Sequence, residues 1–175
     1  GFKPSEVLRK TIIDRIADDY DFVFIDTGPH LDPFLLNGLA ASDLLLTPTP
    51  PAQVDFHSTL KYLTRLPEML ERLEEEGVEP RLSASIGFMS KMTSKRDHET
   101  SHSLAREVYA SNILDSSLPR LDGFERCGES FDTIISANPV SYPGSAEALK
   151  KARTEAERFT KAVFDRIEYI RGASK

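Results

Sequence analysis

Asp21-Phe22-Val23-Phe24-Ile25-Asp26-Thr27-Gly28-Pro29-His30 is the stretch of this sequence that decides the fold class. Residues 22–25 are all apolar, and an unbroken apolar run is typical of a strand in a parallel sheet covered by helices on both faces. Asp26 then falls at the carboxyl end of this strand, the edge at which open α/β sheets bind ligands. The pattern therefore predicts a carboxylate that holds Mg²⁺ on a nucleotide, and Gly28-Pro29 marks a turn that could move when a phosphate is lost. The alternative is that Asp26 only caps the next helix.

Helical and strand patterns alternate along the rest of the chain, as in an α/β sandwich. Helices are predicted from Pro4 to before Asp21, over 32–41, from Asp55 to about 76, over 98–109 and over 145–171, and strands over 44–46, 82–89 and 113–118. The prolines at 48, 50 and 51 should end the strand at Leu46, because proline cannot continue a sheet ladder. Pro67 should bend or divide the long helix, because its ring removes one backbone hydrogen bond.

Two helices and one loop carry specific expectations. The helix over 98–109 should bury Leu104 and Val108 and leave Arg106 on its outer face, and Pro119 to Phe131 should form a long loop. The last helix has apolar residues at steps of three and four, which predicts one stripe that docks along its own domain. We expect the whole of 1–175 to be part of a single domain.

Composition limits the classes of protein that fit. The 175 residues have a net charge of −6, so any nucleic-acid surface must be a local patch. No apolar run approaches the ~18 residues of a membrane span and no signal-peptide pattern opens the chain, so we expect a cytoplasmic protein without membrane association. Cys127 is the single cysteine and cannot form an internal disulfide.

Cationic residues gather in two parts of the sequence. They are Lys91, Lys95 and Arg96 in one turn, and Arg120 and Arg126 in the predicted loop. Guanidinium groups grip phosphate oxygens, so these five could form one patch that tracks a nucleic-acid backbone. The alternatives are an ordinary solvated turn and internal pairing of the arginines with Asp122, Glu125 and Glu129. From the residues alone, the internal pairing is favoured.

Four longer segments carry a family resemblance: residues 19–32, 54–62, 86–91 and 118–132. In content and order they resemble the ParA family of plasmid partition ATPases, in particular its larger, SopA-like type. The resemblance implies a doubly wound, mostly parallel α/β sheet of the P-loop NTPase type (deviant Walker, MinD/ParA), incomplete in this chain. It also implies a cytoplasmic, nucleoid-associated protein that forms a homodimer with ATP, binds DNA non-specifically and hydrolyses ATP when stimulated by a ParB-type centromere-binding protein.

The resemblance also assigns roles to residues. Asp26 would be the Walker B carboxylate that orients Mg²⁺ through water, and Gly28 and Pro29 would belong to the adjacent switch. The residues implied for the adenine site are Met89, Lys91, Met92, Pro119, Arg120, Leu121 and Asp122. The residues implied for contact with DNA are Lys91, Lys95, Arg96, Arg120 and Arg126.

One departure from the family concerns phosphate binding. The chain contains no Gly-Lys pair, so the family's Walker A loop is absent from these residues. Because that loop supplies the backbone N–H groups and the lysine that cradle phosphates, we expect a carboxyl-terminal portion that is inactive alone. Two other classes stay open: a MinD-like membrane-targeting ATPase, which should end in a basic amphipathic segment, and a non-enzymatic interaction fragment.

Overall fold

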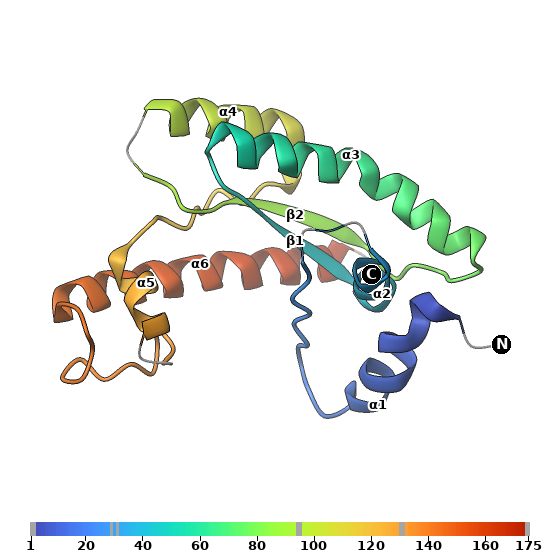
Figure 1. Ribbon diagram of the computed structural model, residues 1–175, viewed down its shortest axis with the longest axis horizontal. Helices are drawn as coiled ribbons and strands as arrows, with labels where there is room; N and C mark the ends of the chain where they lie inside the picture. The colour runs from blue at the N-terminus through green and yellow to red at the C-terminus, as the bar shows by residue number, and fades with distance from the viewer. Residues whose placement is uncertain (1–2, 29, 31, 94–95, 130–131, 174–175) are drawn as a thin grey trace. The chain divides into compact units, whose positions relative to one another are not determined.

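The computed structural model describes residues 3–28, 30, 32–93, 96–129 and 132–173, and it leaves the side chains of 96–98 undescribed. Figure 1 labels the elements along the chain, and the chain divides into two compact units. The first unit comprises Gly1–Leu46 and Ser58–Ser85, and the second comprises Thr47–His57 and Ile86–Lys175. Each unit is described below by itself.

Strands β1 (Leu44–Thr49) and β2 (Ala84–Met89) pair in parallel. The amide of Ser83 donates to the carbonyl of Asp43 (2.8 Å), and the amide of Ser90 donates to the carbonyl of Thr49 (3.1 Å). The prediction that prolines end the first strand at Leu46 is wrong, because β1 continues through Pro48. Thr49 faces β2, so the nitrogen of the preceding residue faces the other edge, where a proline interrupts no pairing with β2.

The predicted strand over residues 22–25 is not formed. Within the described residues, the sheet consists of β1 and β2, and Phe24 leaves 76% of its surface exposed. An apolar run specifies that both faces should be covered, but a strand also needs a neighbour that exchanges backbone hydrogen bonds with it. Neither β1 nor β2 takes that place, so the segment is irregular.

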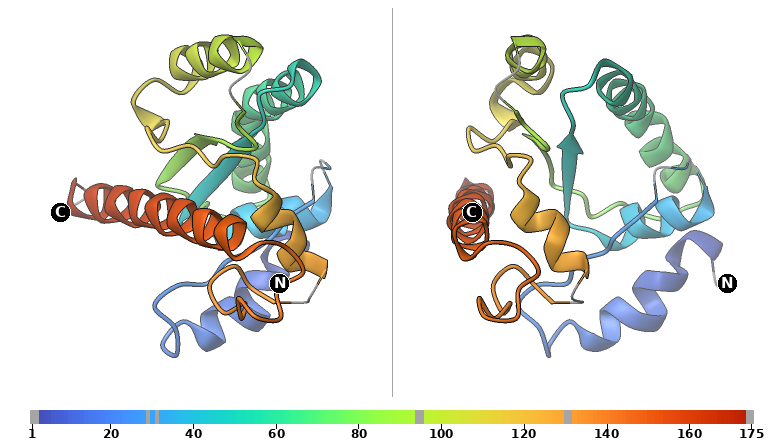
Figure 2. Two further views of the ribbon diagram at one scale, coloured as in Figure 1. Left: turned by 90° about the vertical axis from the view of Figure 1, so that its left-hand side faces the viewer. Right: turned by 60° about the vertical axis from the view of Figure 1, so that its left-hand side comes forward.

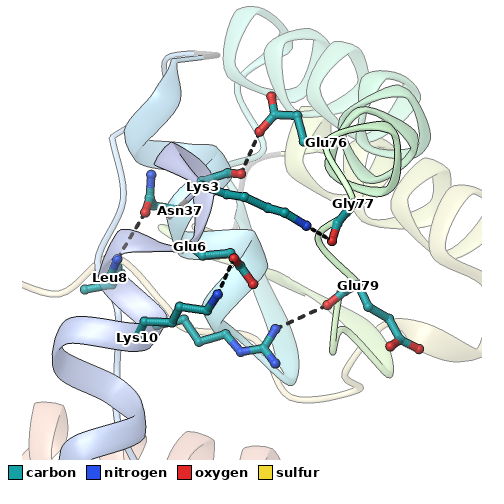
Figure 3. Close-up of polar contacts among 10 residues, drawn as sticks. Lys3, Glu6, Leu8, Lys10, Asn37, Glu76, Gly77 and Glu79 are labelled. Atoms are coloured by element: carbon teal, nitrogen blue, oxygen red, sulfur yellow. Dashed lines mark hydrogen bonds and ion pairs between the residues drawn. The ribbon is translucent and has the colours of Figure 1, made fainter. Parts of the chain in front are cut away.

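The first unit opens with a helical segment made of η1 (Pro4–Glu6), η2 (Arg9–Ile13) and α1 (Asp14–Ile16), and it lies against α2 (Pro33–Ala41) (Figure 2). Polar contacts join this helical segment to the rest of the first unit (Figure 3). The Lys3 ammonium donates to the carbonyl of Gly77, and the Leu8 amide donates to the side-chain oxygen of Asn37 at 3.1 Å. The Ser5 hydroxyl donates to the Glu76 carboxylate at 2.6 Å. The predicted first helix is therefore confirmed as a helical segment over 4–16.

Helix α2 and the long helix α3 (Gln53–Glu75) supply the core of the first unit. Its buried residues are Leu35, Leu36, Leu39, Ala40, Leu66, Met69, Leu73 and Val78. Helix α3 begins at Gln53, two residues before the predicted start at Asp55. It also runs on through Pro67, so this proline does not divide it.

In the second unit, α4 (Arg96–Tyr109) is rotated from the predicted orientation and is followed by η3 (Ala110–Asn112). Leu104 and Val108 are 44% and 47% exposed, whereas Ala105 and Tyr109 are buried. The reason is polar: the hydroxyls of Tyr109 and Thr49 share a hydrogen bond of 2.9 Å, and the hydroxyl of Ser101 donates to the carbonyl of Pro51 at 2.7 Å. Buried polar groups need partners, and these partners fix which face turns inward.

The end of the chain contains two helices that pack on each other (Figure 1). Helix α5 (Asp122–Glu129) replaces the predicted loop, and α6 (Ala146–Ala173) confirms the predicted last helix. A Cβ at Gly123 would lie 2.5 Å from the Cβ of Ala152, so this glycine allows the two helices to touch. Residues 113–118 form no named strand, but Ile113 bridges Gly87 in parallel. The α6 stripe docks within its own unit, where the rings of Phe159 and Phe88 lie 4.7 Å apart.

Gly87 offers a test of how tightly α4 packs on β2. A Cβ at this position would lie 2.4 Å from the ring of Tyr109. We expect Gly87→Ala to lower the free energy of unfolding by about 1–3 kcal/mol, because overpacking forces the ring or the backbone to move. Urea unfolding of the 175-residue chain measures the change.

The matched control is Gly128→Ala in α5, where a Cβ would meet nothing within 4 Å. This variant should be neutral or slightly stabilising, since alanine favours helix over glycine by up to about 1 kcal/mol. Equal stability of the two variants would contradict the close contact between Gly87 and Tyr109.

Candidate functional site

Asp26 lies in the first unit, in the irregular segment that precedes α2. Its side chain is exposed, and its neighbour Ile25 is half-buried. A Cβ built on Gly38 of α2 would lie 2.9 Å from the Cγ2 methyl of Thr27 and 3.8 Å from that of Ile25. The two residues that flank Asp26 therefore rest on α2, while the carboxylate is open to solvent.

The capping alternative for Asp26 is wrong. The residue that caps α2 is Asp32, whose side chain accepts a hydrogen bond from the amide of Leu35 at 3.0 Å. The carboxylate of Asp26 is thus available for another use, because it does not hold the amino end of the helix.

The surroundings of Asp26 limit the kind of metal it could hold. Among the described residues, no group of three or more His, Cys, Asp or Glu side chains could hold a metal ion on its own. Mg²⁺ usually keeps several waters and takes one or two carboxylates together with substrate phosphates. A lone exposed aspartate fits such a shared site and does not fit a dedicated cage of protein ligands.

Gly28 and Pro29 form the predicted switch. Gly28 is exposed, and a Cβ there would meet nothing within 4 Å. Neither a close contact nor a left-handed backbone requires a glycine at this position in the present conformation. Pro29 lies outside the described residues.

In the second unit, the two segments predicted to line the adenine site lie side by side. The amide of Leu118 donates to the carbonyl of Met89 (2.8 Å), that of Met92 to Leu118 (3.1 Å) and that of Arg120 to Met92 (2.9 Å). Met92 and Pro119 form a parallel bridge. Residues 89–92 and 118–120 thus form one ladder that continues beyond the carboxyl end of β2.

The backbone of this ladder turns at Lys91. It is a non-glycine residue with a left-handed backbone (φ 54°), which is uncommon and costs conformational energy. The residue before it bonds to Thr49 and the residue after it bonds to Leu118. The chain therefore turns at Lys91 from one pairing partner to the other, and hydrogen bonds on both sides hold the turn.

The residues of this ladder differ in exposure. Met89 is fully buried, so its side chain belongs to the core. Met92, Pro119 and Leu121 are half-buried, whereas Lys91, Arg120 and Asp122 are exposed. The half-buried and exposed side chains are the ones that a bound ligand could touch.

The cations predicted to contact DNA are only partly described. Lys91, Arg120 and Arg126 are exposed in the second unit. Arg120 pairs with Glu125 (3.1 Å), as the internal-pairing alternative predicted for this loop. Within the part of the chain that the structure describes, no ion pair joins Arg126 to Glu125 or Glu129. Lys95 lies outside the described residues, and Arg96 begins α4 with its side chain undescribed.

Sequence reasoning missed the contacts that support the ladder. The Tyr109 ring covers Gly87, and its hydroxyl reaches Thr49 at the end of β1. Burial raises the pKa of Tyr109, so the phenol stays protonated and can keep this bond. In the sequence, a glycine inside a predicted strand, such as Gly87, is the signal that could have indicated this close approach.

Two further titratable groups take part in packing rather than in the ladder. Burial is the largest cause that raises the pKa of the Cys127 thiol, which makes it a weak nucleophile. Burial also lowers the pKa of His102 on α4; the Arg106 guanidinium lowers it further, and the Asp115 carboxylate acts in the opposite direction.

Comparison with known proteins shows that this chain is similar to several partition proteins. A family described as an AAA domain matches residues 2–83. "Plasmid partition protein A" of Escherichia coli is 61% identical over 165 residues, which cover 94% of this chain and 42% of that protein. "Protein SopA" of Escherichia coli (strain K12) is 23% identical over 161 residues, which cover 92% of this chain and 41% of SopA.

A solved structure named "Partition Protein" is 77% identical with a TM-score of 0.79, and the match covers 98% of this chain and 42% of that one. The chain thus spans about two fifths of the length of these relatives. The α/β fold class of P-loop NTPase type, incomplete in this chain, is confirmed. Within the described residues, no helix combines the length and the apolar character that crossing a bilayer requires.

His102 predicts a pH dependence of stability. Its pKa is lowered in the folded chain, so as pH falls below about 6.5 the unfolded chain binds the proton first and folding weakens. We expect wild-type stability to fall between pH 7.5 and 5.5, and His102→Gln to lose less. The difference should be under about 1 kcal/mol because the side chain is only half-buried. Parallel urea-unfolding profiles of the two proteins would contradict this.

Proposed function

The chain belongs to the ParA-type family of plasmid partition ATPases, and from that premise we propose that it supplies the Mg²⁺ carboxylate, the adenine wall and a DNA-contact surface of such an ATPase. The observation that carries the proposal is the ladder that joins residues 89–92 to residues 118–120. Two segments chosen from the sequence for one ligand are neighbours in the second unit, which supports a shared role.

For nucleotide chemistry, Asp26 would hold a water of the Mg²⁺ ion, which neutralises charge on the ATP phosphates when it is bound. Gly28 and Pro29 would respond to the terminal phosphate as the adjacent switch. The adenine ring would lie against half-buried side chains of the ladder, Met92, Pro119 and Leu121, with Lys91, Arg120 and Asp122 at the exposed margin. Met89 would support this wall from the core.

For partition, the ATP-bound protein would form a homodimer that binds DNA of any sequence on the nucleoid. Lys91, Lys95, Arg96, Arg120 and Arg126 are the residues proposed for contact with phosphates. Arg126 is exposed and is not paired with its neighbours Glu125 or Glu129 in the described part of the chain, which supports its use. A ParB-type centromere-binding protein would stimulate ATP hydrolysis in the cytoplasm and release the DNA.

Asp26→Asn tests the metal role in a full-length protein that contains these residues. Because the amide keeps the shape and loses the charge, we expect Mg²⁺-dependent ATP hydrolysis to fall at least about a hundredfold while the melting temperature changes little. Steady-state ATPase assays and thermal unfolding measure the two quantities.

Asp21→Asn is the matched control, since Asp21 is also an exposed aspartate of the same segment. It should hydrolyse ATP at the wild-type rate. Normal hydrolysis by the Asp26 variant, or equal losses in both variants, would rule out the proposed role of Asp26.

Arg126→Glu tests the DNA surface in the same full-length protein. We expect weaker binding to all DNA sequences alike and a slope of log affinity against log salt that is smaller by about one, because one phosphate contact is lost. ATP binding should be retained. Fluorescence anisotropy with two unrelated duplexes over a range of salt concentrations provides the measurement.

Lys161→Glu serves as the control, because this exposed lysine of α6 pairs with Asp165 at 2.7 Å and lies outside the proposed surface. Its DNA affinity should change less than that of Arg126→Glu. Unchanged DNA affinity in Arg126→Glu, with a lower melting temperature, would assign this arginine to stability and refute the surface.

A further inference from the structure

We propose that Gly38 of α2 is a positioning residue for Asp26 and acts through the Cγ2 methyl of Thr27. The proposal rests on the proposed function, because it presumes that Asp26 serves Mg²⁺. Its geometric basis is the contact described above: a Cβ on Gly38 would lie only 2.9 Å from that methyl. Real Cβ atoms do not approach other heavy atoms so closely, so only glycine leaves the room that Thr27 occupies.

No backbone requirement explains the glycine. Among the described residues, the positive-φ glycine is Gly77, and Gly38 lies inside a regular helix. Glycine in the interior of a helix destabilises it relative to alanine, because it loses more backbone freedom on folding. The close approach of the Ile25–Thr27 segment is the feature of the structure that compensates for this loss.

Helix α2 is a rigid support for that segment. Gly38 is buried, and so are its neighbours Leu35, Leu36, Leu39 and Ala40, which form the core together with α3. The helix is capped at its start by Asp32, and at its end the Ser42 hydroxyl donates to the carbonyl of Gly38 at 2.7 Å. A side chain that presses on α2 therefore moves itself rather than the helix.

The consequence falls on Asp26. Its two neighbours both lie over Gly38. Thr27 is exposed but β-branched, and so it is stiff at χ1; we therefore expect an added methyl at Gly38 to shift the Thr27 backbone and with it the carboxylate of Asp26. In the proposed function Asp26 holds a water of the Mg²⁺ ion, and changing such an outer-shell partner typically weakens metal binding by about 10- to 100-fold, so a displaced Asp26 should raise the Mg²⁺ requirement.

The test adds a methyl group on one side of the contact and removes one from the other side. Gly38→Ala adds a methyl where Thr27 has one, and Thr27→Ser removes that methyl and keeps the hydroxyl. In the full-length protein, we expect Gly38→Ala to raise the Mg²⁺ concentration for half-maximal hydrolysis about tenfold. The double variant should return it to within about twofold of wild type, since the two changes compensate at a direct contact. ATP binding in the absence of Mg²⁺ should be the same in all variants.

A second readout does not depend on hydrolysis. The amide NMR resonance of Asp26 in the 175-residue chain should shift in Gly38→Ala and return toward its wild-type position in the double variant. Gly128→Ala, where the added methyl meets nothing within 4 Å, is the control and should change neither the Asp26 resonance nor the Mg²⁺ requirement.

The outcomes separate this proposal from the proposed function. An unchanged Mg²⁺ requirement in Gly38→Ala, while Asp26→Asn abolishes hydrolysis, would overturn the positioning role and leave the metal role standing. Normal hydrolysis in Asp26→Asn, together with an Asp26 amide resonance that shifts in Gly38→Ala and recovers in the double variant, would overturn the metal role and leave only a packing contact. If Gly38→Ala does not fold, the double variant decides: failure of that variant to fold or to recover the Mg²⁺ requirement would refute the methyl contact.

Discussion

Hydrogen bonding along both edges of the β2 segment is the constraint on which the candidate ligand ladder depends. In the second unit, Ser90 at its end bonds to Thr49 of β1, while Gly87 and Met89 accept from Leu114 and Leu118 on the other edge. A central segment with both edges paired has no freedom to slip in register. The position of residues 118–120 beside Met92 follows from this pairing, as does the left-handed turn at Lys91.

Close approaches at glycine bring elements together within each unit. Gly87 admits the ring of Tyr109, Gly123 admits α6, and in the first unit Gly38 admits the methyl of Thr27. In each case a missing side chain sets a distance that a Cβ would prevent. Because tightly packed interiors transmit small displacements, glycines outside the ligand-contacting residues can influence the site.

The sequence predicted helices better than it predicted strands, inward faces and element ends: of the four predicted strands, those over 44–46 and 82–89 formed, whereas those over 22–25 and 113–118 did not become named strands. The helices over 32–41 and 145–171 and the strand over 82–89 were confirmed within a few residues, because period and capping residues are local signals. The prediction that Leu104 and Val108 form the inward face of α4 was wrong, because Ser101 and Tyr109 make buried hydrogen bonds that turn the opposite face inward. The loop predicted after Pro119 was wrong too, since α5 gains its support from contact with α6.

The sequence by itself indicated the α/β class and the family resemblance, because these depend on local period and on long specific strings, and the resemblance in turn supplied the candidate ligand residues. Only the tertiary structure decided which of those residues are neighbours. It placed 89–92 beside 118–120, assigned the α2 cap to Asp32 instead of Asp26, and left the apolar run at 22–25 outside the sheet. Pairing partners and close contacts join residues far apart in the chain, and no local pattern in the sequence specifies them.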